Sequence, residues 1–229
     1  MARIDLGAIV DVVMPNAAPE SFPLIGLAAA WLYGLAHHGH AAAHCIEGCL
    51  TVHHALVEYG IASRVEAVAV KVERAWGEKG PEDFWGLEPR YNVDGTFNGH
   101  TVLVVPPAGR FIDPTIQQFP DVPGSARAAF PLISPLPGGD GLGDAPFSVY
   151  RNAPDHYLTY LALPESHRQA WHSAKIEAMT DDFRAAGADL AANVFAAMQQ
   201  EPLREKTAAS PYPGAASVAL WLGGCRVCR

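Results

Sequence analysis

The fold is decided by the stretch CIEGCLTVHHALVEYGIASRVEAVAVKV, residues 45–72. Its first part predicts a helix over residues 41–59, with side chains at helical spacing at Cys45, Cys49, Val52 and Leu56. Gly60 can end this helix, because glycine readily adopts the left-handed conformation found at helix C-termini. Residues 64–72 are rich in β-branched side chains with partial alternation, and this pattern predicts a strand.

Further strands and helices are expected downstream of this stretch. HTVLVV (100–105) and RFID (110–113) predict two short strands, and the PPAG between them suits a hairpin turn. Residues 148–163 can add more strands. From residue 164 to about residue 200 the pattern is helical, with a break expected near Gly187.

Three other segments have weaker patterns. Residues 22–36 are apolar and predict a buried helix, since the run is short for a membrane span. Residues 74–98 carry two tryptophans and several glycines, and a long excursion of this kind is often functional. Residues 114–147 are rich in proline and glycine, and we expect them to cover the surface.

Composition excludes several classes of protein. An apolar fraction of 49% and a charged fraction of 17% are typical of a folded globular chain. A net charge of −8 with no run of lysine or arginine argues against nucleic-acid binding. Four cysteines are too few for a disulfide framework, and we see no secretory signal, so a cytoplasmic protein without a membrane partner is expected.

Histidine and cysteine are concentrated in HHGHAAAHCIEGCLTVHH, residues 37–54. Cys45, Cys49 and His53 lie four residues apart on one helix face, and thiolates and imidazoles are the usual zinc ligands. One helix face rarely closes a tetrahedral site, however, and the only other cluster is a single CxxC at residues 225–228. A metal site therefore stays an alternative, and Cys49 is interpreted as a small core side chain.

The other interpretation makes Cys45 a nucleophile. Its place near the start of a helix favours the thiolate, because the positive end of the helix dipole lowers a thiol's pKa. His100 follows Gly99 at the start of a predicted strand, and Asp113 ends the neighbouring one. Adjacent antiparallel strands bring two such residues within side-chain reach, so that the carboxylate can orient the imidazole. Alternatively, His100 is a turn residue and Asp113 only caps the strand exit.

These three motifs resemble those of the transglutaminase-like superfamily. There a cysteine opens a helix that ends in a Gly-Ile-Pro-Ala-Arg-Val type of turn, and here Gly60–Val65 reads GIASRV at the same distance from Cys45. GHTVLVV resembles the family's histidine strand, and FIDPT resembles its aspartate motif. The resemblance spans about residues 25–120. It implies an α+β, papain-like core, with a nucleophile helix packed on an antiparallel sheet and a triad of Cys45, His100 and Asp113.

The chain departs from the family pattern at several positions. Ala43 and Ile46 stand where the family usually has glycine and often an aromatic residue, and Ala62 replaces the proline of the turn. The related arylamine N-acetyltransferases carry an Arg-Gly-Gly lead into the cysteine, which is absent here. An acetyl-CoA donor is therefore not indicated.

We expect a transglutaminase-like catalytic core over residues 1–163 and a helical extension over 164–229 that packs on it, because the pattern becomes helical from residue 164. The expected activity is acyl transfer or hydrolysis on a peptide or small-molecule amide or ester, through a Cys45 thioester, with no cofactor and no metal. Candidate oxyanion donors, besides the Cys45 N–H, are His44, His40, His38 and Trp31. The alternatives are a metal-binding protein that uses residues 37–54, and a non-catalytic scaffold of the same fold.

Overall fold

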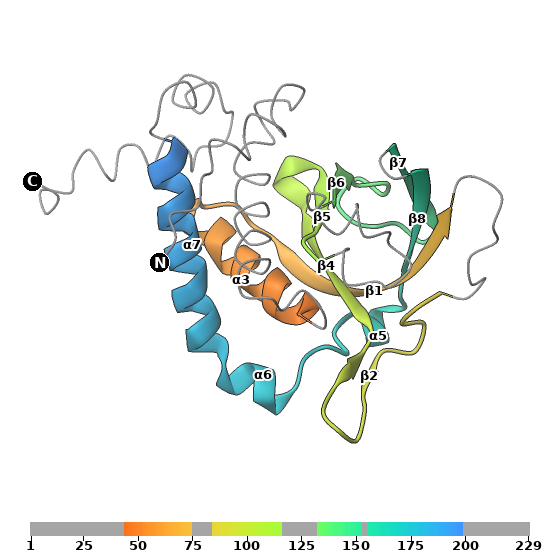
Figure 1. The fold of residues 1–229 in the computed structure, drawn as a ribbon, viewed down its shortest axis with the longest axis horizontal. Coiled ribbons are helices and arrows are strands. Elements are labelled where there is room, and N and C mark those ends of the chain that lie inside the picture. Colours follow the sequence, from red (N-terminus) through yellow and green to blue (C-terminus); the bar gives the residue numbers. More distant parts are fainter. Residues whose placement is uncertain (1–43, 75–83, 116–131, 153–154, 199–229) are drawn as a thin grey trace, which may run out of the picture.

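The structure is a computed structural model that describes residues 44–74, 84–115, 132–152 and 155–198. Figure 1 shows a sheet beside two helices, α3 (Cys45–Glu58) and α7 (Thr180–Met198). The fold is therefore α+β, with an antiparallel sheet packed against helices, as predicted. Within these four ranges no helix is long and apolar enough to cross a membrane.

The main sheet of the described residues has six strands in the order β6-β5-β4-β1-β8-β7, and all neighbours are antiparallel. They are β1 (Arg64–Arg74), β4 (His100–Val105), β5 (Arg110–Asp113), β6 (Leu132–Pro135), β7 (Phe147–Asn152) and β8 (Asp155–Ala162). A small second sheet joins β2 (Arg90–Tyr91) to β3 (Phe97–Asn98), just ahead of β4. The strands expected at 64–72, 100–105, 110–113 and 148–163 are confirmed, whereas β6 is an edge strand that was not predicted.

β1 lies in the middle of the sheet and is buried on both faces. Val65, Ala67 and Ala69 belong to the apolar core around α3, while Val68 and Val70 belong to a second core on the opposite face. Successive side chains of a strand point to opposite faces, so a strand buried on both faces needs a nearly continuous apolar run. This requirement explains the composition of residues 64–72.

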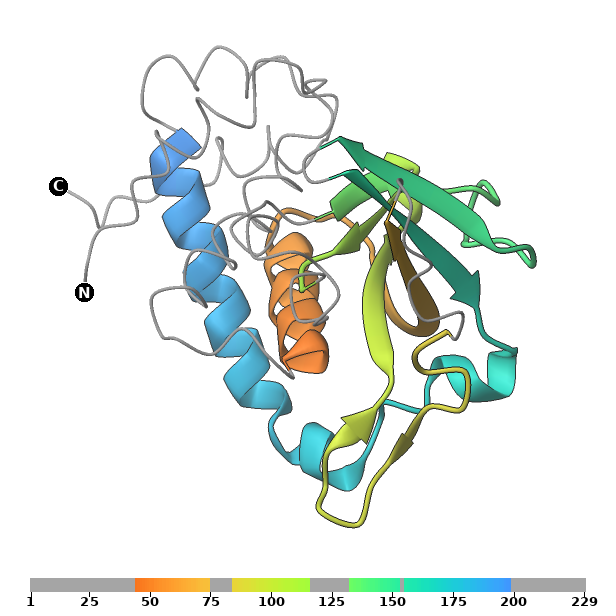
Figure 2. The same cartoon turned by 45° about the vertical axis from the view of Figure 1, so that its right-hand side comes forward.

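α3 lies between α7 and the sheet, and both views of the ribbon show this order (Figures 1 and 2). Its buried face includes Cys49, Val52 and Leu56, which confirms the helical spacing expected from the sequence. At its C-terminal end, the Tyr59 hydroxyl donates a hydrogen bond to the Ala191 carbonyl of α7 at 2.9 Å. α3 is thus held on two sides, and its N-terminus is fixed against the sheet.

The break expected near Gly187 is wrong, because α7 runs without interruption from Thr180 to Met198. Gly187 faces α3 and lies against its backbone. A Cβ added there would lie 2.5 Å from the His54 Cβ and 2.8 Å from the Ala55 N. The glycine therefore permits close helix packing, and this packing outweighs its low helix propensity.

The structure refines other boundaries. The helix expected from residue 41 begins at Cys45, since His44 is its non-helical N-cap. The turn between β4 and β5 is a short 3-10 helix, η2 (Pro106–Ala108), which ends at a left-handed Gly109. The helical region after residue 164 contains α5 (Glu165–Arg168) and α6 (Ala174–Ala178) ahead of α7. The helix expected at 22–36 and the CxxC at 225–228 lie outside the described residues, and the division at residue 163 stays a prediction.

Candidate active site

The structure brings together the three residues singled out from the sequence. Cys45 is the first residue of α3, His100 is the first of β4, and Asp113 is the last of β5. The Cys45 thiol points at the Gly99 carbonyl, with 4.0 Å between sulfur and oxygen, and hydrogen-bonds with the His100 ring. The other side of that ring, Nε2, lies 2.8 Å from Asp113 Oδ2. The three side chains therefore form a continuous chain of contacts.

Strand register explains why His100 meets Asp113. Leu103 pairs with Ile112, so one step further Asp113 lies beside Val102. His100 is two residues from Val102 on the same strand, and side chains two apart share a face. Both polar side chains are completely buried, so their nitrogen and oxygen atoms need hydrogen-bond partners within the protein, and each provides one for the other.

This pair lies on the face of the sheet opposite the α3 core. His100 pairs with Val68, which belongs to the second core. Cys45 still reaches the imidazole because α3 begins beside Gly99, where β4 starts. An added Cβ at Gly99 would lie 2.6 Å from two atoms of the Phe97 ring, so a side chain there would require this ring to move. The nucleophile candidate and its partner thus meet where the helix N-terminus reaches the first residue of the strand.

The surroundings of Cys45 favour its thiolate. Burial raises the pKa of the thiol, but the hydrogen bond with His100, the charge of that ring and hydrogen bonding with Thr101 together outweigh this effect, and the pKa is lowered overall. The N-terminus of α3 adds a positive dipole at the same sulfur. Only 5% of Cys45 is exposed, and exclusion of water strengthens each of these interactions.

His100 is held in the opposite charge state. Burial lowers the pKa of the imidazole, but the charge of Asp113 and its hydrogen bond, followed by the interaction with Cys45, raise the pKa to about 10. A lowered pKa for the thiol and a raised pKa for the ring favour a thiolate–imidazolium pair at neutral pH.

Asp113 accepts hydrogen bonds at both carboxylate oxygens. Oδ2 accepts from His100 and from the Tyr160 hydroxyl, each at 2.8 Å, and Oδ1 accepts from the Thr115 N–H at 3.0 Å. The sequence left two roles open for Asp113, as the partner of His100 or as a cap of the strand exit. Its two carboxylate oxygens perform both roles. Thr115 could have been found from its place two residues after Asp113. Tyr160 is 47 residues away, and no local pattern indicates it.

Cys49 is a core residue, as expected. Its side chain is fully buried, its thiol donates to the Thr101 carbonyl at 3.3 Å, and burial raises the pKa well above the ordinary value. His53 points elsewhere and hydrogen-bonds with the Ser63 hydroxyl at 2.8 Å. Across the residues that the structure describes, no group of three or more His, Cys, Asp or Glu side chains could hold a metal ion.

The proposed oxyanion donors are only partly placed. His44, the N-cap of α3, contacts the Glu47 carboxylate through its Nδ1, so this nitrogen is directed along the helix. His38, His40 and Trp31 lie outside the described residues. The backbone N–H of Cys45 is in the first turn of α3, where a helix provides no intrahelical acceptor.

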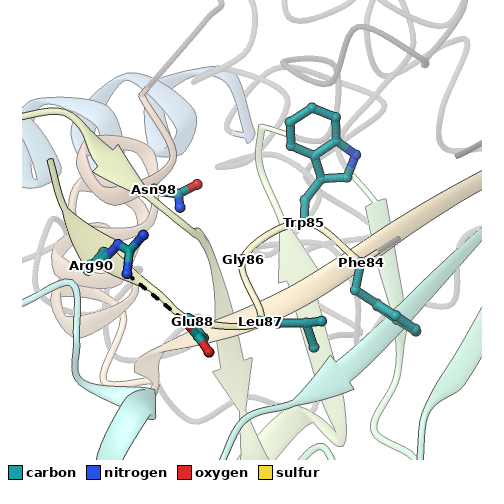
Figure 3. A pocket seen from close by; sticks show the side chains of 7 residues that line it. All are labelled: Phe84, Trp85, Gly86, Leu87, Glu88, Arg90 and Asn98. Atoms are coloured by element: carbon teal, nitrogen blue, oxygen red, sulfur yellow. Dashed lines mark ion pairs between the residues drawn. The ribbon is translucent and has the colours of Figure 1, made fainter. Parts of the chain in front are cut away.

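A pocket of about 510 Å³ is formed by the segment of residues 84–98 (Figure 3). It is lined by Phe84, Trp85, Gly86, Leu87, Glu88, Arg90 and Asn98. Gly86, one of these lining residues, lies close to the start of β4, since an added Cβ would be 3.1 Å from the Gly99 Cα and 3.3 Å from the His100 N. Trp85 is anchored by backbone hydrogen bonds to Val70. The described part of the long excursion therefore lies directly beside the candidate site.

The chain matches no family model, no curated protein and no solved structure. The resemblance to the transglutaminase-like superfamily thus rests on the three short motifs around Cys45, His100 and Asp113. A functional assignment depends on the geometry and chemistry of these residues themselves.

Proposed function

We propose that the chain is a cysteine-dependent acyltransferase or hydrolase with a papain-like, transglutaminase-like core. A single observation carries this proposal: Cys45, at the N-terminus of α3, contacts an imidazole that is held by a buried carboxylate. A buried core thiol such as Cys49 has its pKa raised, whereas the pKa of Cys45 is lowered. Perturbed groups of this kind gather at functional sites.

In the proposed reaction, the Cys45 thiolate attacks the carbonyl carbon of an amide or ester. The new C–S bond pushes the carbonyl electrons onto oxygen, and the Cys45 N–H stabilises that charge. His100 then gives its proton to the leaving amine or alcohol as the C–N or C–O bond breaks, and a thioester remains. Water or an amine next attacks the thioester carbon and loses a proton to His100. The C–S bond then breaks, the acid or the new amide leaves, and the thiolate and the imidazolium are restored.

Asp113 supports both halves of this cycle. Its Oδ2 holds the proton of His100 at Nε2, which leaves Nδ1 to exchange a proton with the sulfur and the leaving group. Its negative charge stabilises the imidazolium between the two steps. Asp113 itself does not need to take the proton.

The substrate of this reaction would be a peptide or a small-molecule amide or ester. The pocket lined by Trp85 and Leu87 supports an apolar group on the substrate, because these two side chains are 44% and 47% exposed. Its two charged members, Arg90 and Glu88, lie 3.9 Å apart and largely cancel one another. A reducing compartment such as the cytoplasm suits a free thiolate, and we keep it as the proposed location.

Rapid acylation by an activated ester tests the proposal. Purified protein mixed with p-nitrophenyl acetate should release nitrophenolate in a burst of one equivalent, and mass spectrometry should find the acetyl group on Cys45. Cys45→Ala should abolish the burst. Cys49→Ala, one helical turn away in the same core, is the matched control and should retain it. Acetylation spread over both cysteines, or a stoichiometric zinc content that blocks it, would end the proposal.

A further inference from the structure

Tyr160 approaches the His100–Asp113 pair on the same face of the sheet, from a strand on the other side of β1. It belongs to β8, which is separated from β4 by β1, and it pairs with Val70. Its hydroxyl nevertheless donates to Asp113 Oδ2 at 2.8 Å, the same oxygen that faces His100 Nε2. The contact joins the C-terminal part of the sheet to the pair on β4 and β5.

The position of the Tyr160 hydroxyl is determined by packing. The side chain is completely buried, and its ring stacks on Phe147 at 5.6 Å and meets the edge of Phe111 at 5.0 Å. Aromatic neighbours on two sides restrict the rotation of the ring. The hydroxyl is therefore presented to Asp113 from a rigid support.

The carboxylate of Asp113 has an anchor that does not depend on the imidazole. The Thr115 N–H binds Oδ1 from within the same turn, and His100 is one of two donors at Oδ2. The Tyr160 hydroxyl is the second donor at Oδ2, so it can hold the carboxylate in place while the proton of His100 is transferred. It also supplies part of the hydrogen bonding that a buried charge requires.

We propose that Tyr160 is a positioning residue that holds Asp113 Oδ2 in line with His100 Nε2. The inference deepens the proposed function and rests on it. Tyr160 acts through Asp113 on the imidazole, and through the imidazole on the Cys45 thiolate. Loss of its hydroxyl leaves the fold in place but weakens the coupling that keeps His100 charged and Cys45 ionised.

The pH dependence of Cys45 alkylation by iodoacetamide measures this coupling without a known substrate. In wild type the rate should rise with pH through a lowered thiol pKa and should change again near the His100 pKa of about 10. In Tyr160→Phe the rate change at the thiol pKa should move to higher pH, and the rate change at the His100 pKa should move to lower pH. We expect the rate at neutral pH to fall on the order of 10-fold, because a hydrogen bond to a charged group is lost.

Tyr59→Phe is the matched control. It removes a hydroxyl that is equally inaccessible and donates at 2.9 Å, but to the Ala191 carbonyl between α3 and α7. A general effect of losing one buried hydrogen bond would appear in both variants, whereas a positioning effect appears in Tyr160→Phe alone. Melting temperatures of both variants show that folded protein is compared.

A double-mutant cycle tests the route of the effect. In an Asp113→Asn background, Tyr160→Phe should change the rate less than about twofold, because the group through which it acts is already altered. If Tyr160→Phe does not fold, 3-fluorotyrosine at position 160 keeps the ring and changes only the donor strength. The two pH steps should then shift, while 3-fluorotyrosine at position 59 leaves them in place.

Three results would overturn the inference: Tyr160→Phe matching Tyr59→Phe, full additivity with Asp113→Asn, or a Cys45 pKa that falls in Tyr160→Phe. The last result would mean that the hydroxyl competes with His100 for Oδ2. The proposed function fails in a different way, namely if wild-type Cys45 itself shows an ordinary thiol pKa.

Discussion

Asp113→Asn separates the two roles that the structure gives to this carboxylate. Asparagine keeps an oxygen that can accept from the Thr115 N–H, so the turn after β5 is preserved. Its NH₂ group then faces His100 Nε2, where the wild type has Oδ2. The imidazole must accept there, which places its proton on Nδ1, toward Cys45. In this tautomer the ring cannot take the proton of the thiol.

The size of the effect follows from the electrostatics of the pair. Burial lowers the pKa of His100, and the charge and hydrogen bond of Asp113 are the main causes that raise it to about 10. Without that charge the pKa falls to its ordinary value near 6.5 or below. At pH 7.5 no more than about a tenth of the rings then carry a proton, which gives a loss of at least ~10-fold. The wrong tautomer extends the loss of rate to ~10³. This loss is smaller than the ~10⁴ of serine-protease triads, because the wild-type thiolate forms before substrate binds.

The assay is the burst rate of Cys45 acylation at pH 7.5, per folded molecule. Asp94→Asn is the matched control, since the Asp94 carboxylate accepts from the Thr96 N–H at 2.9 Å in the same kind of turn but lies on the surface. It should acylate at the wild-type rate. An Asp113→Asn protein that acylates as fast as Asp94→Asn would show that Asp113 only caps its turn, and would remove it from the site.

Three further predictions concern stability. Cys49→Ala should lower the free energy of unfolding in urea by about 1 kcal/mol, because a small buried group is lost. Acylation of Cys45 should persist in this variant, and a loss of acylation would contradict the structural role of Cys49. Gly187→Ala should lower the free energy of unfolding by about 1–3 kcal/mol, because the added methyl group overpacks against α3. Alanine has the higher helix propensity, so a more stable variant would refute the close contact. In Cys45→Ala, Asp113 still raises the His100 pKa, although the contribution of Cys45 is gone and the pKa lies below the wild-type value of about 10. The raised pKa should contribute stability in full below about pH 6.5, the unfolded value, and this stability should be lost as the pH rises through the folded-state pKa. Urea titrations from pH 6 to 10 should show this decline, and adding Asp113→Asn should remove it; a flat profile in Cys45→Ala alone would contradict the raised pKa.

Local patterns in the sequence were enough to predict the helix and the strands that carry the candidate triad. The helix spacing of Cys49, Val52 and Leu56 predicted α3, and the β-branched runs predicted β1, β4 and β5. The contact between His100 and Asp113 also followed, because a short hairpin leaves few possible registers. These features depend on residues close in the chain, whose geometry is set by backbone periodicity. The catalytic role of the three residues stays a prediction until acylation is measured.

The tertiary structure alone decided the rest. Gly187 is an expected helix breaker by propensity, but its place in α7 is set by the close contact with α3, and this contact has no signature in the local sequence. Tyr160 reaches Asp113 from two strands beyond β4, so the contact depends on strand order and on the packing of the Phe111 and Phe147 rings. The lowered pKa of Cys45 likewise arises from the hydrogen bond with His100, the charge of that ring and hydrogen bonding with Thr101, which together outweigh the opposite effect of burial. Such effects depend on distances between residues far apart in the chain, and periodicity along the chain does not contain those distances.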